Sequence, residues 1–156
     1  MNAELHPYVV FLPREQKSKI LSAIFGSKAA VDVLRFSLTQ GISRKIYQKD
    51  LMARLAYSNK TIIENLKLLT RLNVLTEDME KVKKHNRVVW LKAYRLSDIG
   101  KWFALLLAEE RDLSQKEKVD ILQNIFRKYI EWVKKLSKDL NVTKEVLKEI
   151  FEEEMK

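Results

Sequence analysis

Residues 48–75 read QKDLMARLAYSNKTIIENLKLLTRLNVL, and this stretch decides the fold. Leu51 and Leu55 lie four residues apart, which places both on one face of a helix over about residues 48–56. Ser58 is a favourable N-cap for a second helix. That helix carries apolar residues at helical spacing: Ile62, Leu66 and Leu69. The spacing therefore predicts two short helices joined by a sharp turn at residues 56–58.

The hydrophobic period changes after this pair of helices. Asn73 suits a left-handed residue that ends the second helix. Residues 74–82 and 87–96 then alternate and are rich in β-forming side chains, which predicts two strands. Lys83-Lys84-His85-Asn86 separates the two strands. The pattern predicts a β-hairpin with a basic tip.

The order helix, turn, helix, β-hairpin is that of a winged helix-turn-helix. Over roughly residues 27–107 the sequence resembles the winged-helix transcription regulators, especially the arsenic-repressor-like and multiple-antibiotic-resistance-like classes common in archaea. Residues 50–75 carry most of the likeness, and Tyr94-Arg95-Leu96-Ser97-Asp98-Ile99-Gly100-Lys101 adds the exit from the wing. Ala56 and Asn73 stand where such regulators usually have Gly. The resemblance implies a mainly α fold with a small β-hairpin, and the pattern of the last third adds a C-terminal dimerisation helix to this winged helix-turn-helix.

Two further segments precede this motif. The apolar run 8–12 predicts an extended arm, and Pro13 suits the start of a helix that closes near Gly26. On one side of that helix we expect Ile20, Leu21, Ile24 and Phe25. Ser27 is the expected N-cap of a second helix that ends at Gly41, and residues 42–47 are a candidate short strand.

The C-terminal third is helical by pattern. Ser97 begins one helix, and Ser114-Gln115-Lys116-Glu117 is a capping box that opens a long one. The long helix carries a three-repeat heptad seam: Val119, Leu122, Phe126, Tyr129, Val133, Leu136 and Leu140. A chain of this size has little core left to cover so broad a stripe, which predicts a homodimer. Residues 136–146 also fit a second helix-turn-helix, but an acidic helix follows, which favours a plain turn between helices.

These patterns suggest three regions. Residues 1–26 form an N-terminal arm and helix that we expect to contact a second copy. Residues 27–107 form the winged helix-turn-helix domain, and residues 108–156 the helical dimerisation region.

The positive charge is concentrated in the middle of the chain. The 156 residues carry a net charge of +9. Residues 42–96 hold 13 basic and 5 acidic residues, a net +8, whereas residues 97–156 hold 12 and 13. A basic face of this kind attracts phosphate, whether of nucleic acid or of an anionic membrane, and this interpretation is favoured over a merely solvated surface.

In winged helices the second helix of the motif enters the major groove by its N-terminal turns. The predicted contacts on this helix are Ser58, Asn59, Lys60, Thr61, Ile63, Glu64 and Lys67. Asn59 suits adenine, Glu64 the cytosine amine, and Lys60 guanine or phosphate. Two alternatives stay open for Ile63: contact with a thymine methyl, or packing beside the wing.

The hairpin tip and the first helix supply the predicted backbone contacts. On the wing these are Lys81, Lys83, Lys84, His85 and Arg87, and beside the first helix they are Arg44, Lys45 and Lys49. Three acidic residues of the first wing strand would repel phosphate: Glu77, Asp78 and Glu80.

Other classes of function find little support in the sequence. Cys is absent, Gly occurs three times, and His occurs twice, so thiolate metal sites, Gly-rich phosphate loops and a catalytic His pair are not indicated. We expect no enzyme, no cofactor and no metal. No apolar run is long enough for a membrane span and no signal peptide is evident, which favours a cytoplasmic protein. Abundant Lys, Glu and Ile suggest a thermophilic source.

The sequence thus predicts a regulator that binds double-stranded DNA sequence-specifically, as a homodimer on a pseudo-palindromic site. A winged-helix protein–protein adaptor and a nonspecific architectural nucleic-acid binder are the alternatives. The operator, the sign of regulation and any small-molecule effector are not readable from the sequence.

Overall fold

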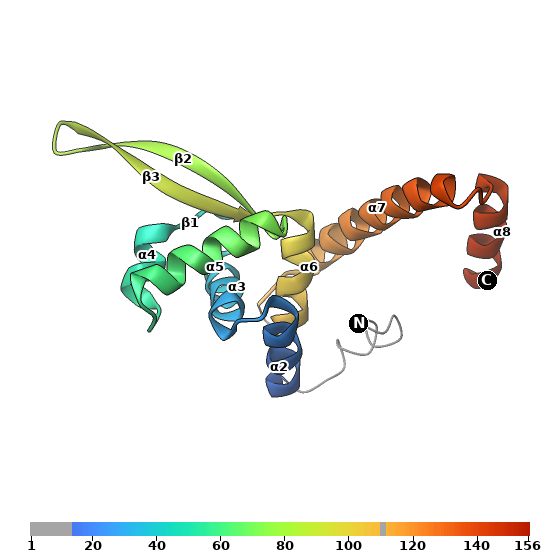
Figure 1. Ribbon diagram of the computed structural model, residues 1–156, viewed down its shortest axis with the longest axis horizontal. Coiled ribbons are helices and arrows are strands. Elements are labelled where there is room, and N and C mark those ends of the chain that lie inside the picture. The colour runs from blue at the N-terminus through green and yellow to red at the C-terminus, as the bar shows by residue number, and fades with distance from the viewer. Residues whose placement is uncertain (1–13, 110–111) are drawn as a thin grey trace. The chain divides into compact units, whose positions relative to one another are not determined.

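The computed structural model describes residues 14–109 and 112–156, with side chains from residue 17 onward (Figure 1). The predicted arm over residues 8–12 lies outside these residues. The chain divides into two compact units, Met1–Ile121 and Leu122–Lys156. The three predicted regions, with boundaries after residues 26 and 107, stay a prediction.

The first unit is mainly helical with a small three-stranded antiparallel sheet, which is consistent with a winged helix. Its described elements are α2 (Arg14–Phe25), α3 (Lys28–Gln40), β1 (Ile46–Tyr47), α4 (Gln48–Arg54), α5 (Asn59–Arg71), β2 (Leu75–Lys84), β3 (Arg87–Leu96), α6 (Asp98–Leu107) and the first turns of α7 (Gln115–Asp139). Helix α4 ends two residues earlier than the spacing predicts, and the short strand is limited to Ile46 and Tyr47.

The ends of the helices follow the local chemistry that the sequence indicates. The Ser27 hydroxyl accepts a hydrogen bond from the Ala30 N–H, and Ser58 does the same for Thr61. Gly41 closes α3 with a φ of +116° and Asn73 follows α5 with a φ of +57°. The predicted capping box is confirmed, because Ser114 and Glu117 exchange hydrogen bonds of 3.1 and 2.8 Å.

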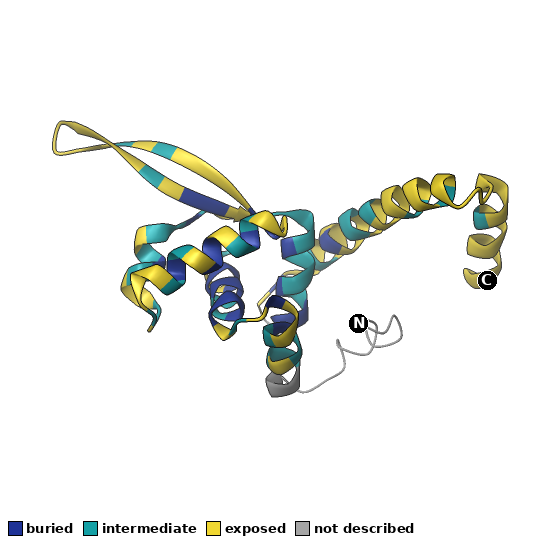
Figure 2. Cartoon of the chain, in the orientation of Figure 1, coloured by how far each residue is buried: buried dark blue, intermediate teal, exposed yellow. Residues whose placement is uncertain are grey.

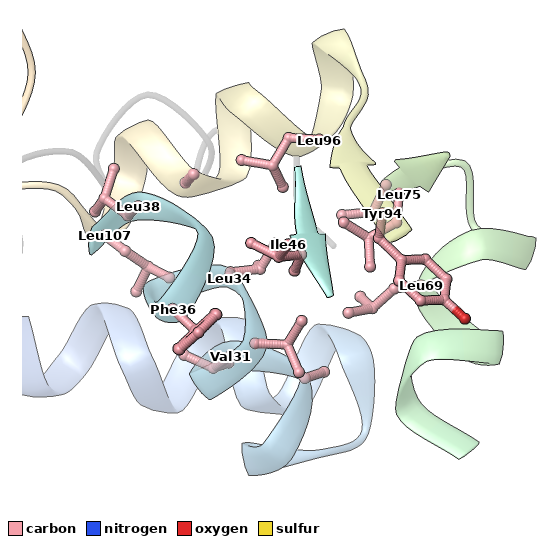
Figure 3. Packing of buried hydrophobic residues seen from close by; sticks show 14 of the residues in the cluster. Val31, Leu34, Phe36, Leu38, Ile46, Leu69, Leu75, Tyr94, Leu96 and Leu107 are labelled. Atoms are coloured by element: carbon pink, nitrogen blue, oxygen red, sulfur yellow. The ribbon is translucent and has the colours of Figure 1, made fainter. Parts of the chain in front are cut away.

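The core of this unit lies between α3, α5, α6 and the base of the sheet (Figure 3). Its side chains come from elements far apart in the sequence: Val31, Leu34, Phe36 and Leu38 of α3, Ile46 of β1, Leu69 of α5, Leu75, Tyr94 and Leu96 of the hairpin, and Leu107 of α6. Leu21 and Phe25 of α2 join them, but Ile24 is exposed, contrary to prediction. The apolar side of α2 is therefore narrower than its sequence indicates.

The sheet has the order β1-β3-β2, with Ile46 opposite Tyr94 and Leu75 opposite Leu96. Strands β2 and β3 stay paired out to Lys84 and Arg87, so the turn contains only two residues. Both of them, His85 and Asn86, have positive φ, which gives a hairpin turn that matches the twist of the strands. Consequently Lys83 and Lys84, which we placed in the tip, lie in the strand.

A single serine closes the base of the hairpin. The Ser97 hydroxyl donates to the Asn73 carbonyl and accepts from the Gly100 N–H, while the Ser97 N–H donates to the Val74 carbonyl at 3.0 Å. Gly100 permits this approach, since a Cβ there would lie 2.1 Å from the Val74 oxygen. The end of α5, the start of β2 and the start of α6 are thereby joined at one point.

The second unit consists of α7 from Leu122 onward and α8 (Lys144–Glu154). Asn141 turns the chain between them with a φ of +56°, and Thr143 caps α8. The Phe126 and Phe151 rings lie 5.9 Å apart and pack the two helices together. Exposed residues dominate this unit (Figure 2). Among the described side chains of α7, only Ile121 is buried.

None of the helices in the described part of the chain is long and apolar enough to cross a membrane.

Candidate nucleic-acid interface

Helix α5 has one fully buried face and one polar face. Ile62, Leu66 and Leu69 have no exposed surface, as their spacing predicts. The Ser58 hydroxyl caps the helix by accepting from the Thr61 N–H at 3.1 Å, so this hydroxyl has a structural role. Four of the predicted contacts are exposed on the opposite side: Asn59, Lys60, Glu64 and Lys67. Thr61 and Ile63 are half-buried, and both alternatives for Ile63 stay open.

The exposed side chains of α5 are only weakly held by each other. Lys60 and Glu64 form an ion pair of 3.9 Å, and their side chains are 85% and 63% exposed. An exposed pair of this kind contributes about 0.3–0.5 kcal/mol, so both groups can exchange it for another partner. The helix dipole adds positive potential at the same end of the helix.

The sequence did not single out Asn65, the buried polar residue of α5. Its side-chain amide donates to the Thr61 carbonyl at 2.8 Å, one turn earlier in the helix, and the residue is 8% exposed. A polar residue in an amphipathic helix is normally expected on the exposed face. Asn65 is buried because its amide forms a hydrogen bond with the backbone of the same helix.

The turn between α4 and α5 is tied to α3 through a tyrosine. The Tyr57 hydroxyl donates to the Asp32 carboxylate at 2.5 Å, and this hydrogen bond, with burial and the carboxylate charge, raises the pKa of Tyr57 to about 12. Asp32 also lies 3.6 Å from the Arg35 guanidinium, which in turn donates to Ser18 of α2. The position of α5 is therefore fixed by side chains of α2 and α3 as well as by its own apolar face.

The acidic residues of β2 all have partners within the unit. Lys45 lies 3.0 Å from Asp78 and 3.9 Å from Glu80, and Lys92 lies 3.7 Å from Glu77. The hydrogen bond from Lys45, with that from the Met79 N–H, lowers the pKa of Asp78.

The same acidic group reaches β1. The Tyr47 hydroxyl donates to Glu80 at 2.6 Å, a bond that raises the pKa of Tyr47. The carboxylates at the base of the hairpin are thus partly neutralised. Lys45, a predicted phosphate contact, forms ion pairs with Asp78 and Glu80. Its contact with DNA stays a prediction.

The remaining predicted backbone contacts are accessible. On the hairpin, the exposed residues are Lys81, Lys83, Lys84, His85 and Arg87, and near α4 they are Arg44 and Lys49. All of them belong to the same unit as α5. Among the residues that the structure describes, no group of three or more His, Cys, Asp or Glu side chains could hold a metal ion.

The comparisons with known proteins add one structure. A chain named a possible transcriptional regulator from Methanosarcina mazei Go1 aligns with 16% sequence identity and a TM-score of 0.41, over 81% of this chain and 87% of that one. A likeness of this size does not establish a shared fold. No family model and no curated protein matches the sequence.

Proposed function

We propose that the protein is a transcription regulator that binds double-stranded DNA sequence-specifically through α5. The observation that carries this proposal is the division of α5 into a buried apolar face and an exposed polar N-terminal end. That end belongs to a segment, residues 42–96, with a net charge of +8. The positive charge of the segment attracts DNA phosphates. The exposed amide of Asn59, ammonium of Lys60 and carboxylate of Glu64 can form hydrogen bonds with base edges in the major groove.

We propose further that the protein acts as a homodimer through α7 and the N-terminal region. The apolar seam of α7 is largely uncovered: Val119 is 41% exposed, Leu122 58%, Phe126 42%, Tyr129 59%, Leu136 56% and Leu140 64%, and Val133 is half-buried. A second copy of the seam would cover it in heptad register. Two α5 helices about 34 Å apart would then read a pseudo-palindrome. Light scattering after size exclusion tests the dimer, and a monomer at micromolar concentration would contradict it.

Selection of bound duplexes from a random pool tests specific recognition. We expect an inverted repeat to be enriched, because a two-fold dimer presents the same helix to two half-sites. Absence of enrichment with retained duplex binding would instead favour an architectural binder. Absence of any duplex binding would favour an adaptor.

Two variants separate base contacts from phosphate contacts. Asn59→Ala should weaken binding to the selected duplex by about 1–3 kcal/mol per half-site and leave binding to random duplexes nearly unchanged. The double variant Lys83→Ala/Lys84→Ala should weaken both. If each lysine touches one phosphate, a dimer loses four contacts, and the slope of log affinity against log salt becomes shallower by about 3.6.

The chain offers a matched control for the loss of charge. Lys134 and Lys135 are also adjacent and exposed, but they lie on α7. Lys134→Ala/Lys135→Ala removes the same charge from the protein and should leave the salt slope unchanged. Equal slopes for the two double variants would show that the hairpin does not touch the phosphates.

A further inference from the structure

The outer half of the hairpin carries a large apolar surface that the phosphate contacts leave unexplained. Trp90 is 58% exposed and Val88 is 51% exposed. Cross-strand pairing places Trp90 beside Lys81 and Val88 beside Lys83, so these four side chains share one face of the ribbon. The other face of the same stretch pairs Val82 with Val89 and Lys84 with Arg87.

Trp90 and Lys81 form one combined surface. The Lys81 ammonium lies 5.9 Å from the centre of the Trp90 ring, within the range of a cation–π contact. The contact holds a positive charge beside an exposed indole. A ligand that covers the indole must therefore also accept a cation at its edge.

Charge changes sign along the hairpin. Residues 81–91 contain three lysines and an arginine and no acidic residue. The base, by contrast, contains Glu77, Asp78 and Glu80, all of which face Lys45, Tyr47 or Lys92. The free positive charge and the free apolar area thus coincide in the outer half.

The occupant that fits both properties is the edge of a DNA duplex. Its deoxyribose rings and thymine methyl groups are apolar, and rows of phosphates flank them. Phosphates alone would match the lysines but would leave the indole in water. An acidic protein would need an apolar strip bordered by carboxylates on both sides.

Accordingly, we propose that the face of the hairpin formed by Trp90, Val88, Lys81 and Lys83 binds duplex DNA, with Trp90 packed against deoxyribose rings and thymine methyl groups and the two lysines on the flanking phosphates. This inference rests on the proposed function and assigns to the wing an apolar contact in addition to its charges. If the apolar contact forms, part of the affinity of the wing for DNA should not depend on salt concentration.

The salt dependence of binding distinguishes the apolar contact from the ionic ones. Trp90→Ala should weaken duplex binding by about 10- to 100-fold at every salt concentration, because burial of an aromatic ring contributes without releasing counterions. The salt slope should not change. Trp90→Phe keeps an aromatic ring and should recover most of the affinity. Val89→Ala, on the opposite face, is the matched control and should bind like the unchanged protein.

The fluorescence of Trp90 gives a second readout. The variant Trp102→Phe/Trp132→Phe retains Trp90 as its sole tryptophan. Addition of the selected duplex should quench its emission and protect it from acrylamide. Vesicles of phosphatidylcholine and phosphatidylserine, and a concentration series without DNA, should leave the emission unchanged. A change with vesicles or with protein concentration alone, and none with DNA, would overturn the proposal in favour of a membrane or a second copy.

The outcomes separate this inference from the proposed function. If the unchanged protein binds no duplex, both fail. If it binds but Trp90→Ala binds equally well, only the apolar contact fails. If Trp90→Ala loses affinity and its salt slope also becomes shallower, the ring merely orients the lysines, and the proposed contact is again overturned.

Discussion

Helices α5 and α7 are both amphipathic, but the apolar face of α5 is buried within its own unit, whereas most of the apolar face of α7 is exposed. The 13 residues of α5 include four buried ones, Ile62, Asn65, Leu66 and Leu69. The 25 residues of α7 include a single buried one, Ile121. Periodic spacing therefore shows that a helix has an apolar face, but it does not show whether the same chain covers that face.

The two apolar faces also contribute differently to the free energy of unfolding. Each side chain on the inner face of α5 contributes to folding of the single chain, because water leaves it when the first unit forms. The seam of α7 would contribute fully only when a second surface covers it, and in the proposed dimer its contribution would depend on protein concentration. Substitutions in the two helices should consequently act on different equilibria.

The largest effect on unfolding is expected in α5. Leu66 has no exposed surface, and Leu66→Ala should lower the free energy of unfolding by about 2–5 kcal/mol through lost burial and a cavity. Chemical denaturation of dilute protein measures it. A loss below about 1 kcal/mol would mean that the α5 face is not held as the structure shows.

The next effect is expected at the point where α6 meets the end of α5. Gly100→Ala would place a Cβ 2.1 Å from the Val74 oxygen, and we expect a loss of about 1–3 kcal/mol. Gly26→Ala is the comparison variant, because Gly26 has a φ of +66° but open space around it, so only backbone strain acts there. Thermal unfolding of both variants would show whether the crowding at Val74 is real.

A smaller loss is expected at the tether between the turn and α3. Tyr57→Phe removes the donor to Asp32 and should cost about 1 kcal/mol. Because the folded-state pKa of Tyr57 is raised from 10 to about 12, the hydrogen bond contributes fully below pH 10 and its contribution disappears as the pH rises through 12.

The pH series therefore has a defined sign. The stability difference between the unchanged protein and Tyr57→Phe should be constant up to pH 10 and shrink above it. Tyr129→Phe is the control, since Tyr129 is 59% exposed and should show no such difference. A difference that grows between pH 10 and 12 would contradict the hydrogen bond.

The smallest effect on unfolding is expected in α7. Leu136 is 56% exposed, and Leu136→Ala should change the unfolding of dilute monomer by no more than about 0.5 kcal/mol. The same variant should weaken the proposed dimer, as sedimentation or light scattering would detect. If monomer stability falls as much as in Leu66→Ala, the contrast between the two helices is wrong.

Much of the first unit follows from its sequence. The spacing of Ile62, Leu66 and Leu69, the caps at Ser27 and Ser58, and the left-handed Asn73 are all local features, and each is confirmed. Strand β3 has the predicted bounds, whereas β2 continues two residues further than predicted, to Lys84, because the left-handed geometry of both His85 and Asn86 allows a two-residue turn.

The candidate site was less accessible to such reasoning. Lys45 meets Asp78, and Tyr47 meets Glu80, because the two-residue strand β1 pairs with β3, and so short a strand gives no signal of its partner. Tyr57 and Asp32 are 25 residues apart, a contact that only the folded chain creates. Trp90 lies in the predicted second strand of the hairpin, and the hydrophobic period does not show that this part of the strand extends beyond the core.

The hairpin is held at its base by the junction of Ser97, Val74 and Gly100. Ten paired residues place its tip about 30 Å from that point. At this length, a change of about 6° in the direction of the hairpin would displace its tip by about 3 Å, close to the roughly 3.4 Å rise per base pair of DNA. If the hairpin binds DNA as we propose, the close approach of Gly100 to Val74 influences which phosphates the outer lysines can reach. In that complex, Gly100→Ala would act on the DNA contact of the tip from about 30 Å away.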